Sequence, residues 1–140
     1  NPERAWKFSA GECAEMLFRF QNVGTQKLRL SLLKDEEQEF RIEYDGREQV
    51  LRLDATRSGY STAGEKATGS QMTAEADVPL RDGQLELRIF VDRCSVEIFI
   101  QDGEKVMSTR VFPRKSGRGV TLSTDGKGCE AEAILYELNV

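Results

Sequence analysis

An alternation of apolar and polar residues between positions 85 and 113 constrains the fold of this chain more than any other feature. Every second residue is aliphatic from Leu85 to Val91, and again from Val96 to Ile100. A period of two is typical of a β-strand that buries one face. A short polar step separates the runs, so we expect them to pair as a hairpin with both apolar faces on one side. Phe90 is the exception, because it falls on the polar side of its run.

A second hairpin is predicted directly after the first. The segment Gln101-Asp102-Gly103-Glu104 supplies its turn, because Asp and Gly tolerate the positive φ angles of tight hairpins. A third strand is expected from Lys105 to Phe112. Three strands joined by two turns predict an antiparallel sheet in this part of the chain.

The rest of the chain repeats this pattern, and no long segment has a persuasive helical period. Alternation predicts further strands in five segments: Met16–Phe20, Leu28–Leu32, Phe40–Tyr44, Leu51–Leu53 and Ile134–Leu138. Asp-Gly pairs at 45–46, 82–83 and 125–126 mark turns. A sheet with one apolar face must bury it against a second layer. We therefore expect one all-β domain over residues 1–140, a two-sheet antiparallel β-sandwich of the concanavalin A-like or jelly-roll type.

Composition excludes several classes of function. The net charge of −4, with both signs interspersed, argues against a nucleic-acid partner. No apolar run approaches the roughly 20 residues that a helix needs to cross a bilayer. Cys13, Cys94 and Cys129 lie far apart, which favours buried thiols over a disulfide framework or a metal site. We predict no metal and no cofactor.

Histidine is absent, which removes the commonest general base and every Ser-His or Cys-His nucleophile pair. Carboxylate chemistry, as in glycosidases, is what remains. Asp92 and Glu97 flank the first hairpin turn and are the pair to weigh. Carboxylates on the polar face of a sheet are far commoner than catalytic pairs, so we interpret both as structural. We expect the 140-residue chain alone to be inactive.

The first hairpin also resembles a family signature. The run I-F-V-D-R-x-S-V-E-x-F at residues 89–99 is similar to the hallmark of the C-terminal domain of glycoside hydrolase family 32. The segment Leu51–Gly59 resembles the family's L-D-R-x-x-S-G segment, and Ala133–Leu138 resembles its closing strand. Ala55 stands where the family often has Arg, and Cys94 stands where Ser is usual.

The resemblance implies that the chain is a fragment of a longer enzyme, because members of this family place the active site on an N-terminal five-bladed β-propeller. The parent would be a retaining hydrolase of β-fructofuranosides such as sucrose, fructans or sucrose 6-phosphate. The family's W-M-N-D-P-N-G and R-D-P segments are absent from this chain, and Glu12-Cys13 lacks the Pro that usually follows the family's acid/base Glu. The parent would be cytoplasmic if it is a sucrose-6-phosphate hydrolase, and secreted if it is a levanase or inulinase.

As a member of that family, the chain would be a noncatalytic accessory domain that packs in cis against its propeller and stabilises it. In some relatives the sandwich also joins two subunits, so a homodimer is a further expectation. The charged residues of the matched segments are the candidates for inter-domain or turn-fixing contacts: Arg57, Asp92, Arg93 and Glu97.

An independent sugar-binding module is the alternative function. β-Sandwiches often present aromatic rings on which sugar rings stack. Tyr60, Trp6 and Tyr44 are the candidate sugar contacts.

Overall fold

The computed structural model of the chain has eleven β-strands and no helix among the residues that it describes. These residues are 4–9, 13–36, 38–57, 73–92, 95–110, 119–126 and 128–137. The strands are β1 (Arg4–Ser9), β2 (Ala14–Gln21), β3 (Lys27–Lys34), β4 (Glu39–Asp45), β5 (Val50–Arg57), β6 (Thr73–Asp77), β7 (Leu85–Val91), β8 (Ser95–Ile100), β9 (Lys105–Arg110), β10 (Gly119–Thr124) and β11 (Glu130–Glu137).

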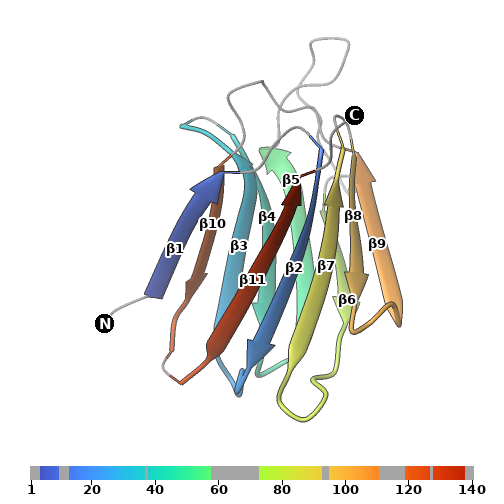
Figure 1. Cartoon of the computed structure of the whole chain (residues 1–140). Helices are drawn as coiled ribbons and strands as arrows, with labels where there is room; N and C mark the ends of the chain where they lie inside the picture. The colour runs from blue at the N-terminus through green and yellow to red at the C-terminus, as the bar shows by residue number, and fades with distance from the viewer. Residues whose placement is uncertain are drawn as a thin grey trace.

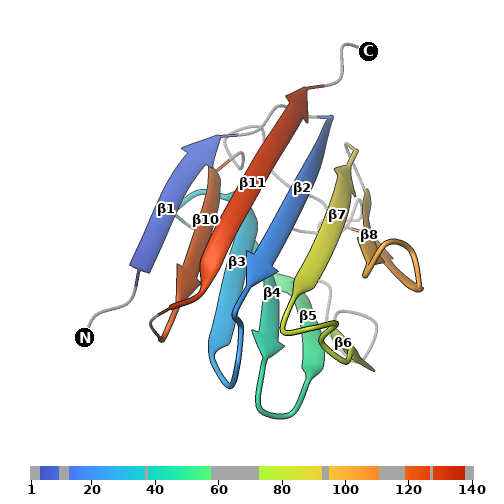
Figure 2. The same ribbon diagram turned by 60° about the horizontal axis from the view of Figure 1, so that its bottom comes forward.

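The strands form two antiparallel sheets that lie one behind the other (Figure 1). One sheet has six strands in the order β1-β10-β3-β4-β5-β6, and the other has five in the order β11-β2-β7-β8-β9. In Figure 2, β11 and β2 cross in front of β10 and β3, so both layers can be followed. The predicted two-sheet antiparallel β-sandwich is confirmed.

One hydrophobic core fills the space between the sheets, and the alternating residues of most strands point into it. The cross-strand pairs Val91–Val96, Ile89–Ile98 and Leu87–Ile100 place the apolar faces of the first hairpin together, as the sequence predicts. Burying an aliphatic side chain of this kind stabilises a fold by roughly 1.5–3 kcal/mol. Cys129 is buried in the same core, whereas Cys13 is partly buried and Cys94 lies outside the described residues.

The Asp-Gly pairs make turns for two different physical reasons. Asp102 and Gly103 have φ angles of 59° and 88°, so the β8–β9 turn uses the left-handed region that these residues tolerate. The pair at 82–83 turns the chain in the same way before β7. At Gly46 the reason is space, because a Cβ there would lie 2.3 Å from the carbonyl oxygen of Gly24.

Sequence alternation did not predict β1, β6 and β10. Strand β6 lies at an edge of its sheet and is exposed at four of its five positions, so it has no buried face that alternation could show. Strand β10 does alternate, with Val120 and Leu122 buried, but each of its other residues is small. Strand β9 ends at Arg110, and the expected end at Phe112 lies outside the described residues.

A buried glutamine ties the second hairpin to the loop before β7. Gln101 is only 5% exposed, and its amide nitrogen donates to the carbonyl oxygens of Pro79 and Gln84, each at 3.0 Å. Its amide oxygen accepts from the backbone N–H of Glu86 at 2.9 Å. One side chain therefore makes three hydrogen bonds to the backbone, one of them to the Gln84 carbonyl that also accepts from the backbone N–H of Arg81.

We expect Gln101→Ala to lower the free energy of unfolding by about 2–4 kcal/mol, because it removes three hydrogen bonds of a buried amide, each contributing about 0.5–1.5 kcal/mol. Urea denaturation of the purified chain measures this loss. Asp102→Asn is the matched control in the same turn, since Asp102 is exposed and Asn tolerates its positive φ angle. Equal losses for the two variants would contradict the role given to the Gln101 amide.

Candidate functional site

The outer face of the five-stranded sheet carries an apolar band, although the solvent side of an antiparallel sheet is usually polar. The strand register places Ile134 beside Leu17, Leu17 beside Arg88, Arg88 beside Phe99, and Phe99 beside Val106. This row crosses all five strands, which lie side by side in Figure 1. The apolar band consists of Leu17, Phe90, Phe99, Val106, Ile134 and Tyr136.

Two phenylalanine rings form the centre of the apolar band. The rings of Phe90 and Phe99 meet edge to face, with centroids 5.5 Å apart and planes at 82°. Beside them is a shallow hollow of about 290 Å³, which is also lined by Glu86, Arg88, Asp102 and Gly103. Toward the two edges of the sheet, Val106 and Tyr136 are 52% and 49% exposed. The band thus presents both a hollow and protruding apolar side chains.

Acidic side chains surround the apolar band. The described carboxylates on this face outnumber the described guanidinium groups: Glu15, Glu86, Glu97, Glu130 and Glu132 against Arg19 and Arg88. Arg19 pairs with Glu86 at 2.9 Å and with Glu132 at 3.3 Å. Glu97 is exposed and forms no ion pair with another described residue. Among the described side chains, the surroundings of the band are therefore negatively charged on balance.

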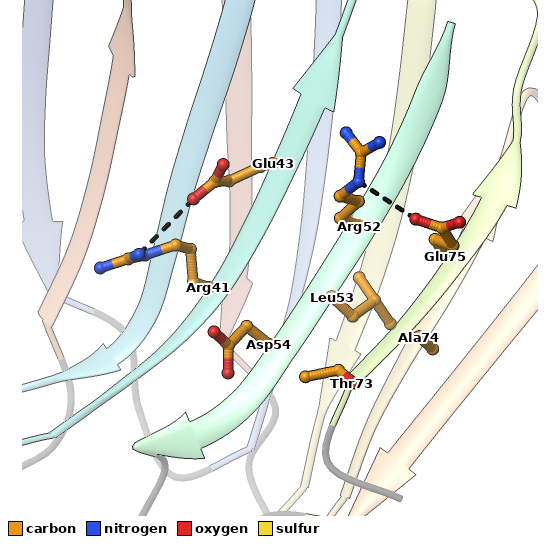
Figure 3. A pocket seen from close by; sticks show the side chains of 8 residues that line it. All are labelled: Arg41, Glu43, Arg52, Leu53, Asp54, Thr73, Ala74 and Glu75. Atoms are coloured by element: carbon orange, nitrogen blue, oxygen red, sulfur yellow. Dashed lines mark hydrogen bonds and ion pairs between the residues drawn. The ribbon is translucent and has the colours of Figure 1, made fainter. Parts of the chain in front are cut away.

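The outer face of the six-stranded sheet is charged, and most of its described charges form ion pairs. A groove of about 490 Å³ runs over β4, β5 and β6 (Figure 3). Within it Arg41 lies 3.5 Å from Glu43, and Arg52 lies 3.1 Å from Glu75. The groove is lined by Arg41, Glu43, Arg52, Leu53, Asp54, Thr73, Ala74 and Glu75. A negatively charged ligand would have to displace one of these carboxylates from its arginine.

Glu39 is the most enclosed carboxylate on the outer face of the six-stranded sheet. Its side chain is 11% exposed and accepts hydrogen bonds from Ser31 at 2.7 Å and Arg41 at 3.1 Å. Arg57 lies 3.5 Å away. Burial raises the pKa of Glu39, but the hydrogen bonds from Ser31 and Arg41 and the charge of Arg41 outweigh it and lower the pKa. The network fixes the ends of β4 and β5.

The residues expected at an inter-domain contact lie on different sheets. Glu97 is on the outer face of β8 opposite Phe90, and Asp92 lies in the turn, where its backbone N–H donates to the carbonyl of Ser95 at 2.9 Å. Arg57 ends β5 of the other sheet, and Arg93 lies outside the described residues. The structure therefore associates Asp92 and Glu97 with one hairpin, and Arg57 with the Glu39 network.

The structure corrects one of the expected sugar contacts. Tyr44 is 2% exposed, and its hydroxyl donates to the carbonyl oxygen of Val78 at 2.6 Å. Burial, with the nearby charge of Asp45, raises the pKa of Tyr44 to about 12. A sugar cannot stack on a ring that lies in the core. Tyr60 and the side chain of Trp6 lie outside the described part of the structure.

The described ranges contain neither a metal-binding cluster nor a membrane-spanning helix. No group of three or more cysteine or carboxylate side chains there is placed to hold a metal ion. No helix long and apolar enough to cross a bilayer occurs in them.

The hairpin, the closing strand and the sandwich all match one family. Residues 2–140 match the sequence profile described as "Glycosyl hydrolases family 32 C terminal". The chain is 37% identical over 97 residues to a sucrose-6-phosphate hydrolase of Staphylococcus xylosus, covering 69% of this chain and 18% of that protein. It is 30% identical over 131 residues to a levanase of Bacillus subtilis, covering 92% of this chain and 17% of that protein. This chain belongs to glycoside hydrolase family 32, as its C-terminal domain.

Solved structures agree with this fold. An exo-inulinase from Aspergillus awamori superposes with a TM-score of 0.80 at 20% identity, over 99% of this chain and 29% of that chain. A sucrose-6-phosphate hydrolase from Lactobacillus gasseri gives a TM-score of 0.70 at 23% identity, over 96% of this chain and 28% of that chain. The chain thus spans less than a third of the length of each of these relatives.

Protonation of Glu39 should remove part of the stability of the sandwich. Because the folded-state pKa is lowered, the contribution is complete above the unfolded pKa of about 4.3 and is lost as pH falls through the folded value. We expect Glu39→Gln to lower the melting temperature at pH 7 and to change it less at pH 3. Melting curves of the original chain and the variant at both values test this. A difference that stays constant between pH 7 and pH 3 would argue against an ionised Glu39 as the source.

Proposed function

We propose that this chain is a noncatalytic accessory domain of a β-fructofuranosidase-type enzyme, and that it stabilises the catalytic domain of the same polypeptide. The observation that carries the proposal is the family match over residues 2–140. The named relatives include sucrose-6-phosphate hydrolases, a levanase and a fructan β-fructosidase. All of these names describe hydrolysis of fructose-containing sugars, which is the reaction class proposed for the parent.

The chemistry of the chain supports an accessory role. Without histidine, a hydrolase of this kind needs two cooperating carboxylates. On the described surfaces, Glu43 and Glu75 of the groove pair with arginines, and Asp54 accepts hydrogen bonds from the backbone N–H and hydroxyl of Thr56. Glu97 faces Phe90 across the hairpin. Neither arrangement provides an acid and a nucleophile on opposite sides of a bound sugar.

The size of the relatives supports a cis partner. The chain covers 17% and 18% of the levanase and the sucrose-6-phosphate hydrolase, so the catalytic groups of such enzymes have ample room elsewhere in the polypeptide. Asp92, Arg93 and Glu97 are the charged residues that we propose for contacts with that domain or for fixing the hairpin turn. A homodimer and a direct contact with fructoside remain secondary proposals.

The purified 140-residue chain should release no reducing sugar from sucrose, sucrose 6-phosphate, levan or inulin. The longer polypeptide encoded by the same gene should hydrolyse at least one of the four. Product release in matched assays at equal molar concentration measures both. Turnover by the 140-residue chain that disappears in Asp92→Asn or Glu97→Gln would overturn the proposal and identify that pair as catalytic.

A sugar-binding module is the competing function, and the exposed ring of Tyr136 is the described feature that favours it. We expect no saturable change in tryptophan and tyrosine fluorescence when levan, inulin or sucrose is added to the chain. A saturable change that is lost in Tyr136→Ala and kept in Tyr136→Phe would favour sugar binding as the function of this chain.

A further inference from the structure

We propose that the apolar band and the acidic side chains around it form the surface on which the catalytic domain of the same polypeptide packs. This inference rests on the proposed accessory function and names the surface that performs it. The partner surface is expected to be apolar at its centre and basic around it, with one side chain entering the hollow beside Phe90 and Phe99.

The two outer faces of the sandwich differ in character. On the six-stranded sheet the outward side chains are mostly polar or charged and pair with one another, as Arg41 and Arg52 do with Glu43 and Glu75. On the five-stranded sheet the outward row is apolar from Ile134 to Val106, interrupted only by Arg88. Exposed contiguous apolar surface rimmed by polar groups marks an interaction site. Burial of this band against a partner would remove it from water.

Arg88 lies in the middle of the apolar row, on β7. Its guanidinium lies 3.6 Å from the carboxylate of Glu15, while its strand position lies between Leu17 and Phe99. The aliphatic part of an arginine can cover apolar neighbours while its charged end stays solvated. Leu17, although it faces outward, is only 5% exposed. Water is thus already partly excluded from the band around Leu17 and Arg88, as it is from the centre of protein interfaces.

The carboxylates around the apolar band favour a basic partner over a second copy of this chain. Two copies of this chain meeting through the same face would bring the carboxylates of Glu15, Glu97 and Glu132 near their own counterparts, and like charges across an interface are costly. A basic partner surface would instead give Glu97 the ion pair that it lacks among the described residues. The relatives of this chain are several times longer than it, so a covalently attached domain is present at high effective concentration. These facts favour the catalytic domain over a second copy.

Thiol labelling of the full polypeptide tests the surface directly. Val106→Cys and Tyr136→Cys place single probes at the two ends of the apolar band, and Thr73→Cys places one on the exposed edge strand β6 of the other sheet. Each variant is treated with N-ethylmaleimide in the native state and in urea, and modification is followed peptide by peptide with mass spectrometry. We expect the band probes to react at least tenfold more slowly in the native state than in urea, and the Thr73→Cys probe less than threefold more slowly.

The outcomes separate the inference from the proposed function. Fast labelling of both band probes in a polypeptide that still hydrolyses fructosides overturns the inference and leaves the accessory function standing. Protection that disappears on dilution to monomer, or that appears only when levan is added, overturns it in favour of a second copy or a sugar. Failure of the full polypeptide to hydrolyse any fructoside overturns the proposed function and the inference together.

Discussion

A single core between two sheets is the constraint on which the rest of this structure depends. Most strands give alternate side chains to that core, so the fold fixes which residues remain for the two outer faces. Because the inner faces supply the burial that holds the sandwich together, the outer faces are free to differ. One is a charged surface with internal ion pairs, and the other carries the apolar band.

Alternation in the sequence predicts the strands well but does not say which side of a strand faces the core. In the first hairpin the aliphatic side is the buried side, as expected. In β11 the alternating pair Ile134 and Tyr136 lies on the outer face instead, and Leu135 packs against the core. Only the register with β2 decides this, and that register joins segments more than a hundred residues apart. Composition and period carry no information about it.

One residue of the candidate surface, Phe90, stands out in the sequence. Phe90 breaks the alternation of its strand, and the structure shows the reason, since its ring packs edge to face on Phe99. The sequence does not predict that Leu17 faces outward, because Met16, Leu17 and Phe18 form a continuous apolar run. The sequence does not predict the burial of Glu39 either, because its partner Ser31 comes close only when β3 and β4 pair. Long-range pairing therefore determines both the band and the charged network.

We propose that this sandwich serves a catalytic domain encoded with it. Determining the coding sequence directly upstream of Asn1 tests this proposal without any assumption about ligand or interface. We expect an in-frame domain bearing the N-D-P-N-G-like nucleophile segment that the family resemblance implies. A start codon or a signal peptide directly before Asn1 would contradict it, and would make this chain a free-standing sandwich.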